Sequence, residues 1–123
     1  MKRDDSQFDI DFFECLLKRT PRDPQVVEIL GGLYARNGRV DEGLKMDRKL
    51  VRLQPDNPTA YYNLACSLAL KHRKADALRA LNEAVELGYL DVEWMRQDPD
   101  LECLWGHPGF RKLIAELERS TFS

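Results

Sequence analysis

The sequence predicts an all-α fold, a short solenoid of helix-turn-helix repeats with capping helices at each end. The central evidence is a 34-residue unit written twice, which begins at Pro24 and begins again at Pro58. Apolar residues recur at the three- and four-residue spacing of helices, and no stretch shows the strict alternation typical of strands. A helix pair of this length cannot bury its apolar face alone, so we expect neighbouring pairs to stack on one another.

The two copies agree at positions where packed helices need similar side chains. Four pairs of residues are separated by the same offset of 34: Leu30/Leu64, Gly31/Ala65, Glu42/Asp76 and Leu53/Leu87. In its length, and in the large, small and aromatic residues Leu30, Gly31 and Tyr34, the unit resembles the tetratricopeptide repeat (TPR) family. That resemblance implies a right-handed stack of antiparallel helix pairs that binds other proteins in its concave face, and it implies no reaction.

A helix over residues 6–20 is predicted to precede the repeats as an N-terminal cap. Five apolar residues are expected to share its inner stripe: Phe8, Phe12, Phe13, Leu16 and Leu17. Phe12 and Phe13 are too apolar to leave in water, so we expect this helix to cover the exposed side of the first full repeat.

The first repeat covers residues 24–57. Asp23 is suited to cap its leading helix, and Pro24 to the first helical position, where a missing N–H costs nothing. Gly38 can adopt a positive φ and end that helix, and a second helix is expected over residues 40–54.

Asp47 departs from the repeat pattern, because the second copy has Leu81 at the equivalent position. An unpaired carboxylate buried there would be costly. Two resolutions are open: the helix rotates so that Met46 or Leu50 faces inward, or Asp47 finds a partner such as Arg48 or Lys18.

The second repeat covers residues 58–91 and matches the pattern better. Its inner positions are Tyr61, Leu64, Ala65 and Leu68 in the leading helix, and Ala77, Leu81, Ala84, Val85 and Leu87 in the second. Gly88 stands where a glycine in the left-handed region would end the pair.

Residues 92–119 are predicted to form degenerate helices that close the array as a C-terminal cap, in a single domain over residues 1–123. A short helix is expected after Asp98-Pro99 and a longer one from Pro108 to about Arg119. Seven apolar residues at helical spacing support this: Leu101, Leu104, Trp105, Phe110, Leu113, Ile114 and Leu117.

Composition limits the classes of function. The 123 residues carry a net charge of −2 and are 43% hydrophobic and 33% charged, so we expect no general attraction to nucleic acid or anionic membranes. The charged residues that follow Met1 predict no secretory signal, and no apolar run is long enough to span a membrane. Three scattered cysteines, Cys15, Cys66 and Cys103, favour a reducing compartment, so a cytoplasmic location is expected.

The residues that could act in catalysis or bind a metal form no recognisable motif. Cys103 and His107 offer only two ligands, whereas a closed zinc site needs four. Gly31-Gly32 lies within a predicted helix and lacks the strand and lysine of a phosphate loop. The acidic pair Asp98/Asp100 is interpreted as a helix start. We therefore expect no enzyme, no cofactor and no metal.

The candidate binding surface is the groove that leading helices line in the TPR family. The groove positions in the first repeat are Gln25, Glu28, Ile29, Gly32 and Arg36, and those in the second are Thr59, Tyr62, Asn63, Cys66 and Leu70. Tyr62 and Asn63 are expected to contribute most to binding. One alternative stays open: the chain's own C-terminal helix fills this groove, because an amphipathic helix after a short array has few other places to bury its face.

The carboxylate clamp by which some TPR domains bind chaperone tails is disfavoured. Asn63 matches the clamp asparagine of the second repeat, but Glu28 and Gly32 stand where a lysine and an asparagine are needed. The remaining interpretation is a non-enzymatic adaptor that binds a protein or peptide segment, with self-association left open. The alternative is a helical-repeat scaffold with a nucleic-acid-binding or enzymatic role.

Overall fold

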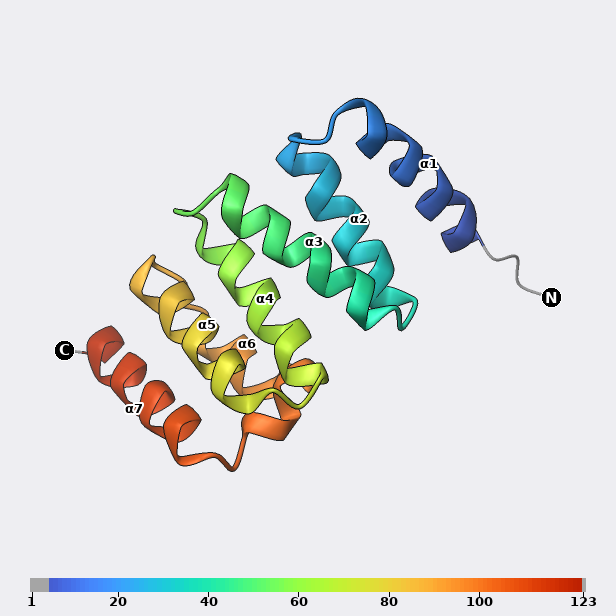
Figure 1. The fold of residues 1–123 in the computed structure, drawn as a ribbon. Helices are drawn as coiled ribbons and strands as arrows, with labels where there is room; N and C mark the ends of the chain where they lie inside the picture. The colour runs from blue at the N-terminus through green and yellow to red at the C-terminus, as the bar shows by residue number, and fades with distance from the viewer. Residues whose placement is uncertain (1–4, 123) are drawn as a thin grey trace. The chain divides into compact units, whose positions relative to one another are not determined.

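The computed structural model describes residues 5–122, and every regular element in that stretch is helical (Figure 1). The helices are α1 (Asp5–Arg19), α2 (Pro24–Arg36), α3 (Val40–Leu53), α4 (Pro58–Leu70), α5 (Lys74–Glu86), α6 (Val92–Gln97), the 3-10 helix η1 (Pro99–Leu104) and α7 (Pro108–Phe122). These bounds follow the predicted ones closely, except that α7 continues past Arg119.

The chain divides into two compact units, Met1–Asp56 and Asn57–Ser123. The division falls between the two predicted repeats. A single domain over residues 1–123 stays a prediction.

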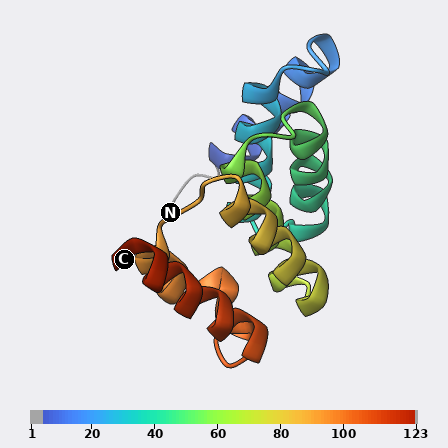
Figure 2. The ribbon, with the colours of Figure 1, turned by 90° about the vertical axis from the view of Figure 1, so that its left-hand side faces the viewer.

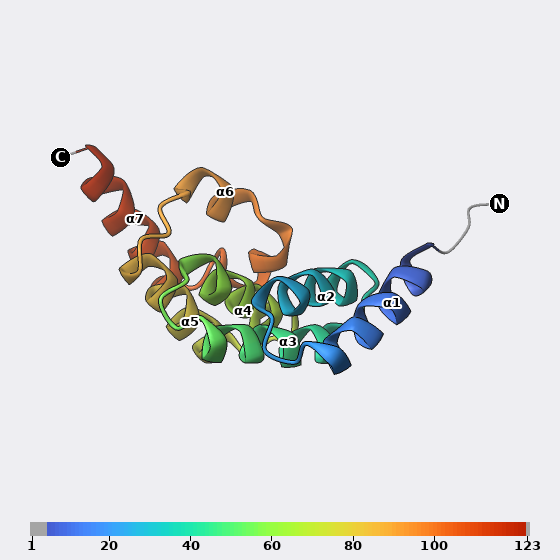
Figure 3. The same ribbon diagram turned by 90° about the horizontal axis from the view of Figure 1, so that it is seen from above.

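In the first unit, α2 packs against α3 as an antiparallel pair and α1 packs on α2 (Figure 3). One core cluster of this unit consists of Ile10, Leu30, Leu33 and Tyr34, with Phe13, Leu17 and Met46 packed at its edge. The predicted leading and second helices of the repeat are therefore present, with a further helix against them.

The inner stripe of α1 differs from the predicted one. Ile10, Phe13 and Leu17 face α2, whereas Phe8 is 71% exposed and Phe12 is 54% exposed. The predicted stripe was wrong for Phe8 and Phe12, because residues at the spacing 10, 13 and 17 already fill the contact with α2. The two phenylalanines lie on the opposite side of the helix.

Asp47 lies on the buried face of α3, between Leu44 and Leu50. The helix has not rotated to expose it, and its carboxylate is not left without an interaction. A Cβ on Gly31 would lie 3.2 Å from the Cβ of Met46 and 3.5 Å from Oδ1 of Asp47. Glycine at position 31 therefore lets α2 approach α3 closely.

The predicted helix ends are confirmed in detail. Asp23 accepts a hydrogen bond from Gln25 N (2.9 Å), and Asn57 accepts one from Thr59 N (2.9 Å), each just before the proline that begins a leading helix. The turn after α2 has a positive φ of 73° at Gly38, and the equivalent turn after α4 has a φ of 59° at His72.

In the second unit, α4 pairs with α5, η1 packs on α4, and α7 packs on α5 and α6 (Figure 2). Its fully buried large side chains are Leu81, Met95, Leu101 and Leu104. Phe110 is also buried, as expected for a C-terminal cap, whereas Trp105 is 38% exposed. The tail therefore belongs to the core of this unit.

Candidate functional site

The predicted groove positions on α2 remain accessible. Gln25, Glu28 and Arg36 are exposed, and Gly32 is half-buried. Ile29 is the large apolar residue among them and is 44% exposed. This face of α2, which we call the α2 face, therefore presents apolar surface between an acidic and a basic side chain.

The equivalent positions on α4 have a different environment. Thr59 and Leu70 are exposed and Asn63 is half-buried. Tyr62 and Cys66 are only 5% and 8% exposed. The structure therefore buries two of the five predicted positions on α4 almost completely.

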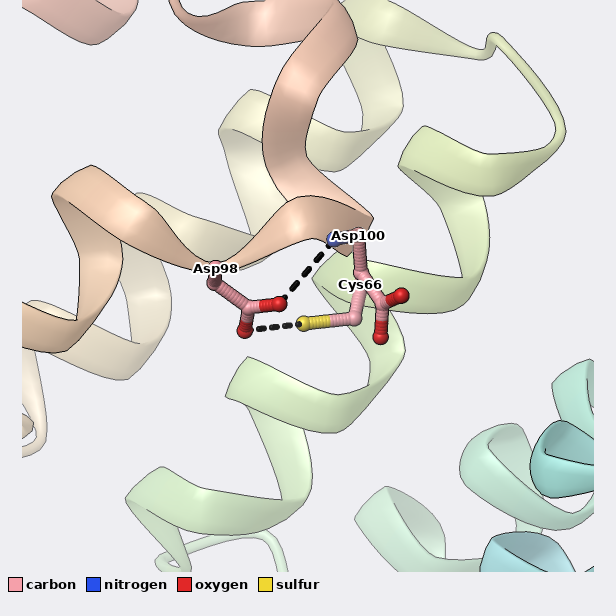
Figure 4. Close-up of side chains that lie close together, drawn as sticks. All are labelled: Cys66, Asp98 and Asp100. Carbon is pink, nitrogen blue, oxygen red and sulfur yellow. Dashed lines mark hydrogen bonds between the residues drawn. The ribbon is translucent and has the colours of Figure 1, made fainter.

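The residues that cover Tyr62 and Cys66 come from the chain's own C-terminal region. We call residues 98–104, from Asp98 through η1, the cover segment. The Tyr62 hydroxyl donates a hydrogen bond to Oδ2 of Asp98 (2.6 Å), and the Cys66 thiol donates to the same oxygen (3.7 Å). Figure 4 shows Cys66 pointing from α4 at the Asp98 carboxylate, with Asp100 beside them.

Local backbone geometry holds Asp98 in this position. Asp98 ends α6 by donating its N–H to Trp94 O (2.8 Å) and begins η1 by accepting from Asp100 N through Oδ1 (3.0 Å). One carboxylate oxygen thus caps a helix while the other binds α4. The sequence-based interpretation of Asp98 as a helix start is confirmed, and its second role was missed.

Apolar contacts anchor the rest of the cover segment. Leu101 and Leu104 are fully buried. The Cys103 thiol donates a hydrogen bond to Ala69 O at the end of α4 (3.3 Å). The cover segment is therefore held on α4 near both of its ends.

Burial controls the electrostatics of this cluster. Asp98 is 4% exposed, and its carboxylate accepts from three donors. Burial, and then the hydrogen bond with Asp98, raise the pKa of the Tyr62 hydroxyl. Burial, and then the charge of Asp98, raise the pKa of the Cys66 thiol, so it stays protonated and donates.

Two neighbours complete the cluster. The ring of Tyr89 stacks on that of Tyr62, with centroids 4.2 Å apart and planes within 6°. Burial, and then the charge of Asp98, raise the pKa of the Asp100 carboxyl. Asp100 also lines a hollow of about 440 Å³ between the end of α4 and η1, together with Leu70 and His72.

Cys66, Asp98 and Asp100 are residue types that can bind a metal ion. One ligand atom from each lies within 4.8 Å of the others. The hydrogen bonds described above already engage Asp98, and a protonated thiol is a poor ligand because metals bind the thiolate. The arrangement fits a structural cluster better than a metal centre, and the absence of a metal stays a prediction.

The sequence left open that the chain's own C-terminal helix fills the groove. On α4 a C-terminal segment does cover two groove positions, but it is not the long helix. The cover segment lies there, whereas the long helix α7 packs on α5 and α6. No spacing rule pointed to this pairing, because Asp98 precedes a proline and looks like an ordinary cap. The one available signal was that Tyr62 and Cys66 replace Glu28 and Gly32 of the first repeat.

Comparison with known proteins supports the fold. No family model matches the chain. A crystal structure of MamA superposes with a TM-score of 0.73 at 22% identity, over 91% of this chain and 64% of that chain. A structure of MamA residues 41 to the end from Desulfovibrio magneticus RS-1 has a TM-score of 0.72 at 21% identity, over 97% of this chain and 70% of that chain. The all-α helical-repeat fold with capping helices is thereby confirmed.

A curated relative also matches by sequence. It is a chloroplastic protein of Arabidopsis thaliana, 31% identical over 90 residues, which make up 71% of this chain and 27% of the relative. The chain thus matches only about a quarter of the length of that protein. Among residues 5–122, no helix is long and apolar enough to cross a membrane. A cytoplasmic location stays a prediction.

Proposed function

We propose that this chain is a TPR-type interaction module that binds a protein or peptide segment on the inner face of its leading helices. One observation carries the proposal: the inner face of α4 already holds a polypeptide segment, the cover segment, through carboxylate hydrogen bonds and buried leucines. The geometry of such a helix face is therefore suited to a short acidic and apolar stretch of chain.

The α2 face is the surface proposed for a partner. Its residues stand 34 positions before those of α4, so Glu28 is equivalent to Tyr62 and Gly32 to Cys66. Glu28 and Ile29 are exposed, whereas Tyr62 and Cys66 lie under the cover segment. A complementary segment would place an apolar side chain on Ile29, a basic group near Glu28 and an acidic group near Arg36.

The proposed role is non-enzymatic. The reactive side chains on the inner face of α4 hold the cover segment in place. Among them, the Cys66 thiol is kept protonated. The net charge of −2 favours a protein partner over nucleic acid. Among the predicted groove residues, Thr59, Asn63 and Leu70 keep accessible surface, whereas substitution of Tyr62 would disturb the fold as well as any binding.

The experiment begins with peptides selected from a displayed random library on the purified protein. Their dissociation constants are then measured against the wild type, Ile29→Asp and Arg36→Glu. We expect Ile29→Asp to weaken binding about tenfold or more, because a charge would replace a central apolar contact. Arg36→Glu is expected to weaken the binding of peptides that carry acidic residues.

The matched control is Arg52→Glu, which makes the same charge change at an exposed position on α3. It should leave the affinity unchanged, and all three variants should melt near the wild type. Unchanged binding by a well-folded Ile29→Asp variant would remove the α2 face as the binding surface.

A further inference from the structure

We infer that copies of this chain associate head to tail, with the outer side of α1 in one copy docked into a hollow beside α7 in the next. This contact is separate from the partner binding proposed for the α2 face. It rests on an exposed aromatic surface in one unit and an apolar hollow of opposite charge in the other.

The aromatic surface is formed by Phe8 and Phe12, which are exposed one helical turn apart on the side of α1 away from its core. Large exposed aromatic side chains in such a pair mark contact sites more often than ordinary surface. The Phe12 ring meets the Phe13 ring edge-on, with centroids 5.1 Å apart, so a partly buried neighbour holds Phe12 in place. A side chain already fixed in orientation loses little entropy on docking.

Carboxylates border the two phenylalanines. Asp9 and Asp11 are both exposed, and their positions in the helix place them on opposite sides of the Phe8–Phe12 line. The outer side of α1 is therefore an apolar ridge with an acidic border.

The hollow lies in the second unit between α6, α7 and the end of η1. Its volume is about 360 Å³, at the small end of the range of ligand pockets. Four of its lining residues are apolar: Trp105, Phe110, Ile114 and Ala115. Trp105 lines this hollow and is 38% exposed, so docking there would cover apolar surface.

Charged groups at the hollow give it a positive balance. Its remaining lining residues are Arg96, Arg111 and Glu118. Arg96 forms an ion pair with Glu118, whereas Arg111 is exposed and has no ion pair among the residues that the structure describes. Two arginines against one glutamate leave one net positive charge, which complements Asp9 and Asp11.

This complementarity identifies the occupant as a second copy. Phenylalanines bordered by carboxylates fit an apolar hollow with an exposed arginine, and the chain carries one of each surface. Such a contact is heterologous, so every docked pair keeps one open α1 and one open hollow. Assembly can therefore continue beyond the pair, as an open chain or a closed ring, and the mean mass should rise with concentration.

The test is sedimentation velocity and light scattering of the full chain over a wide concentration range. We expect Phe8→Ser with Phe12→Ser, and separately Ala115→Trp, to weaken association about tenfold or more, because central aromatic contacts dominate most interfaces. Arg111→Glu changes an exposed residue and keeps the hollow testable if Ala115→Trp melts early. Leu90→Ser, which removes an exposed apolar side chain elsewhere, is the matched control and should associate like the wild type.

Mixing the variants gives the decisive outcome. The double phenylalanine variant keeps its hollow, and Ala115→Trp keeps its α1, so an equimolar mixture should form pairs and nothing longer. A wild type that stays monomeric at every concentration overturns the inference. So does association that survives the phenylalanine and hollow variants, or a mixture that forms no pairs. None of these results bears on peptide binding by the Ile29 variant, so the two proposals fail independently.

Discussion

The two repeats use the same device, a tyrosine hydroxyl bound to a carboxylate of a neighbouring element, at different positions and with different exposure. In the first unit Tyr34 on α2 donates to Glu14 on α1, and Arg39 lies over the Tyr34 ring, 4.9 Å from its centroid. In the second unit Tyr62 on α4 donates to Asp98. Glu14 is partly exposed, whereas Asp98 is almost fully buried.

This difference shows how near-equivalent helix pairs acquire separate roles. Tyr34 faces the preceding helix, so its bond secures α1 and leaves the α2 face open. Tyr62 faces the groove side, so its bond secures the cover segment there. The position of the tyrosine along the leading helix therefore differs together with the exposure of the inner face.

The largest expected effect is a difference in stability between variants of the two carboxylates, Asp98 and Glu14. Asp98→Ala should lower the free energy of unfolding by about 2–4 kcal/mol, because it leaves the Tyr62 hydroxyl and the Cys66 thiol buried without an acceptor. Glu14→Ala should cost about 1 kcal/mol or less, because water can reach the site it vacates. Urea unfolding followed by circular dichroism measures both, and equal losses would remove the distinction drawn here. Asp98→Asn is the control, since it keeps one acceptor oxygen.

A second prediction uses pH. Burial raises the pKa of Tyr62 and of the Cys66 thiol in the folded chain above their ordinary values of 10.0 and 9.0. Well below pH 9 both groups are protonated in both states and add no pH dependence. Above it the unfolded chain releases protons that the folded chain keeps, so stability falls as the pH rises.

The comparison between units sharpens this test. Tyr62→Phe with Cys66→Ala should flatten the alkaline fall in the urea midpoint more than Tyr34→Phe does, because two titrating groups are removed in place of one. Tyr34 also has a raised pKa, through burial and then its bond to Glu14, so its variant should show a smaller change of the same sign. If the urea midpoint falls with pH at the same rate in the wild type and in both variants, these tyrosine and cysteine residues do not control alkaline stability.

The smallest expected effect concerns the turns of the two repeats. Gly38 and His72 occupy equivalent positions and both have a positive φ, which costs a residue with a side chain about 1 kcal/mol. His72→Gly should therefore stabilise by up to about 1 kcal/mol, and Gly38→Ala should destabilise by a similar amount. His72→Ala controls for loss of the imidazole and should change little. Melting curves that move in the same direction for His72→Gly and Gly38→Ala would contradict this account.

Much of the fold could be predicted because the same helix-start and packing residues recur in both repeats. Pro24 and Pro58 fix the starts of two helices, and the 34-residue offset aligns their packing. The inner stripe of α1 could not be predicted, because Phe8 and Phe12 are more hydrophobic than the residues around Ile10 and yet lie on the other side. Which apolar stripe is buried depends on the surface of α2, which the pattern of α1 alone does not contain.

The candidate site was predictable only in part. The groove positions of α2 lie at the surface where the repeat alignment places them. The covering of Tyr62 and Cys66 by Asp98 joins residues more than thirty positions apart, and no local pattern encodes such a pairing. Asp98 has an adequate explanation as a cap, so nothing in the sequence required a second role for it.

The contrast between Glu28 and Tyr62 also bears on how the chain reaches its fold. A newly made tail that carries Asp98 and Asp100 would encounter two related helix faces, on α2 and on α4. On α4 the Tyr62 hydroxyl and the Cys66 thiol offer donors to Asp98, whereas on α2 the equivalent of Tyr62 is the carboxylate of Glu28. Like charges would repel there. The carboxylate of Glu28 therefore disfavours Asp98 on α2, whereas the hydroxyl of Tyr62 favours it on α4.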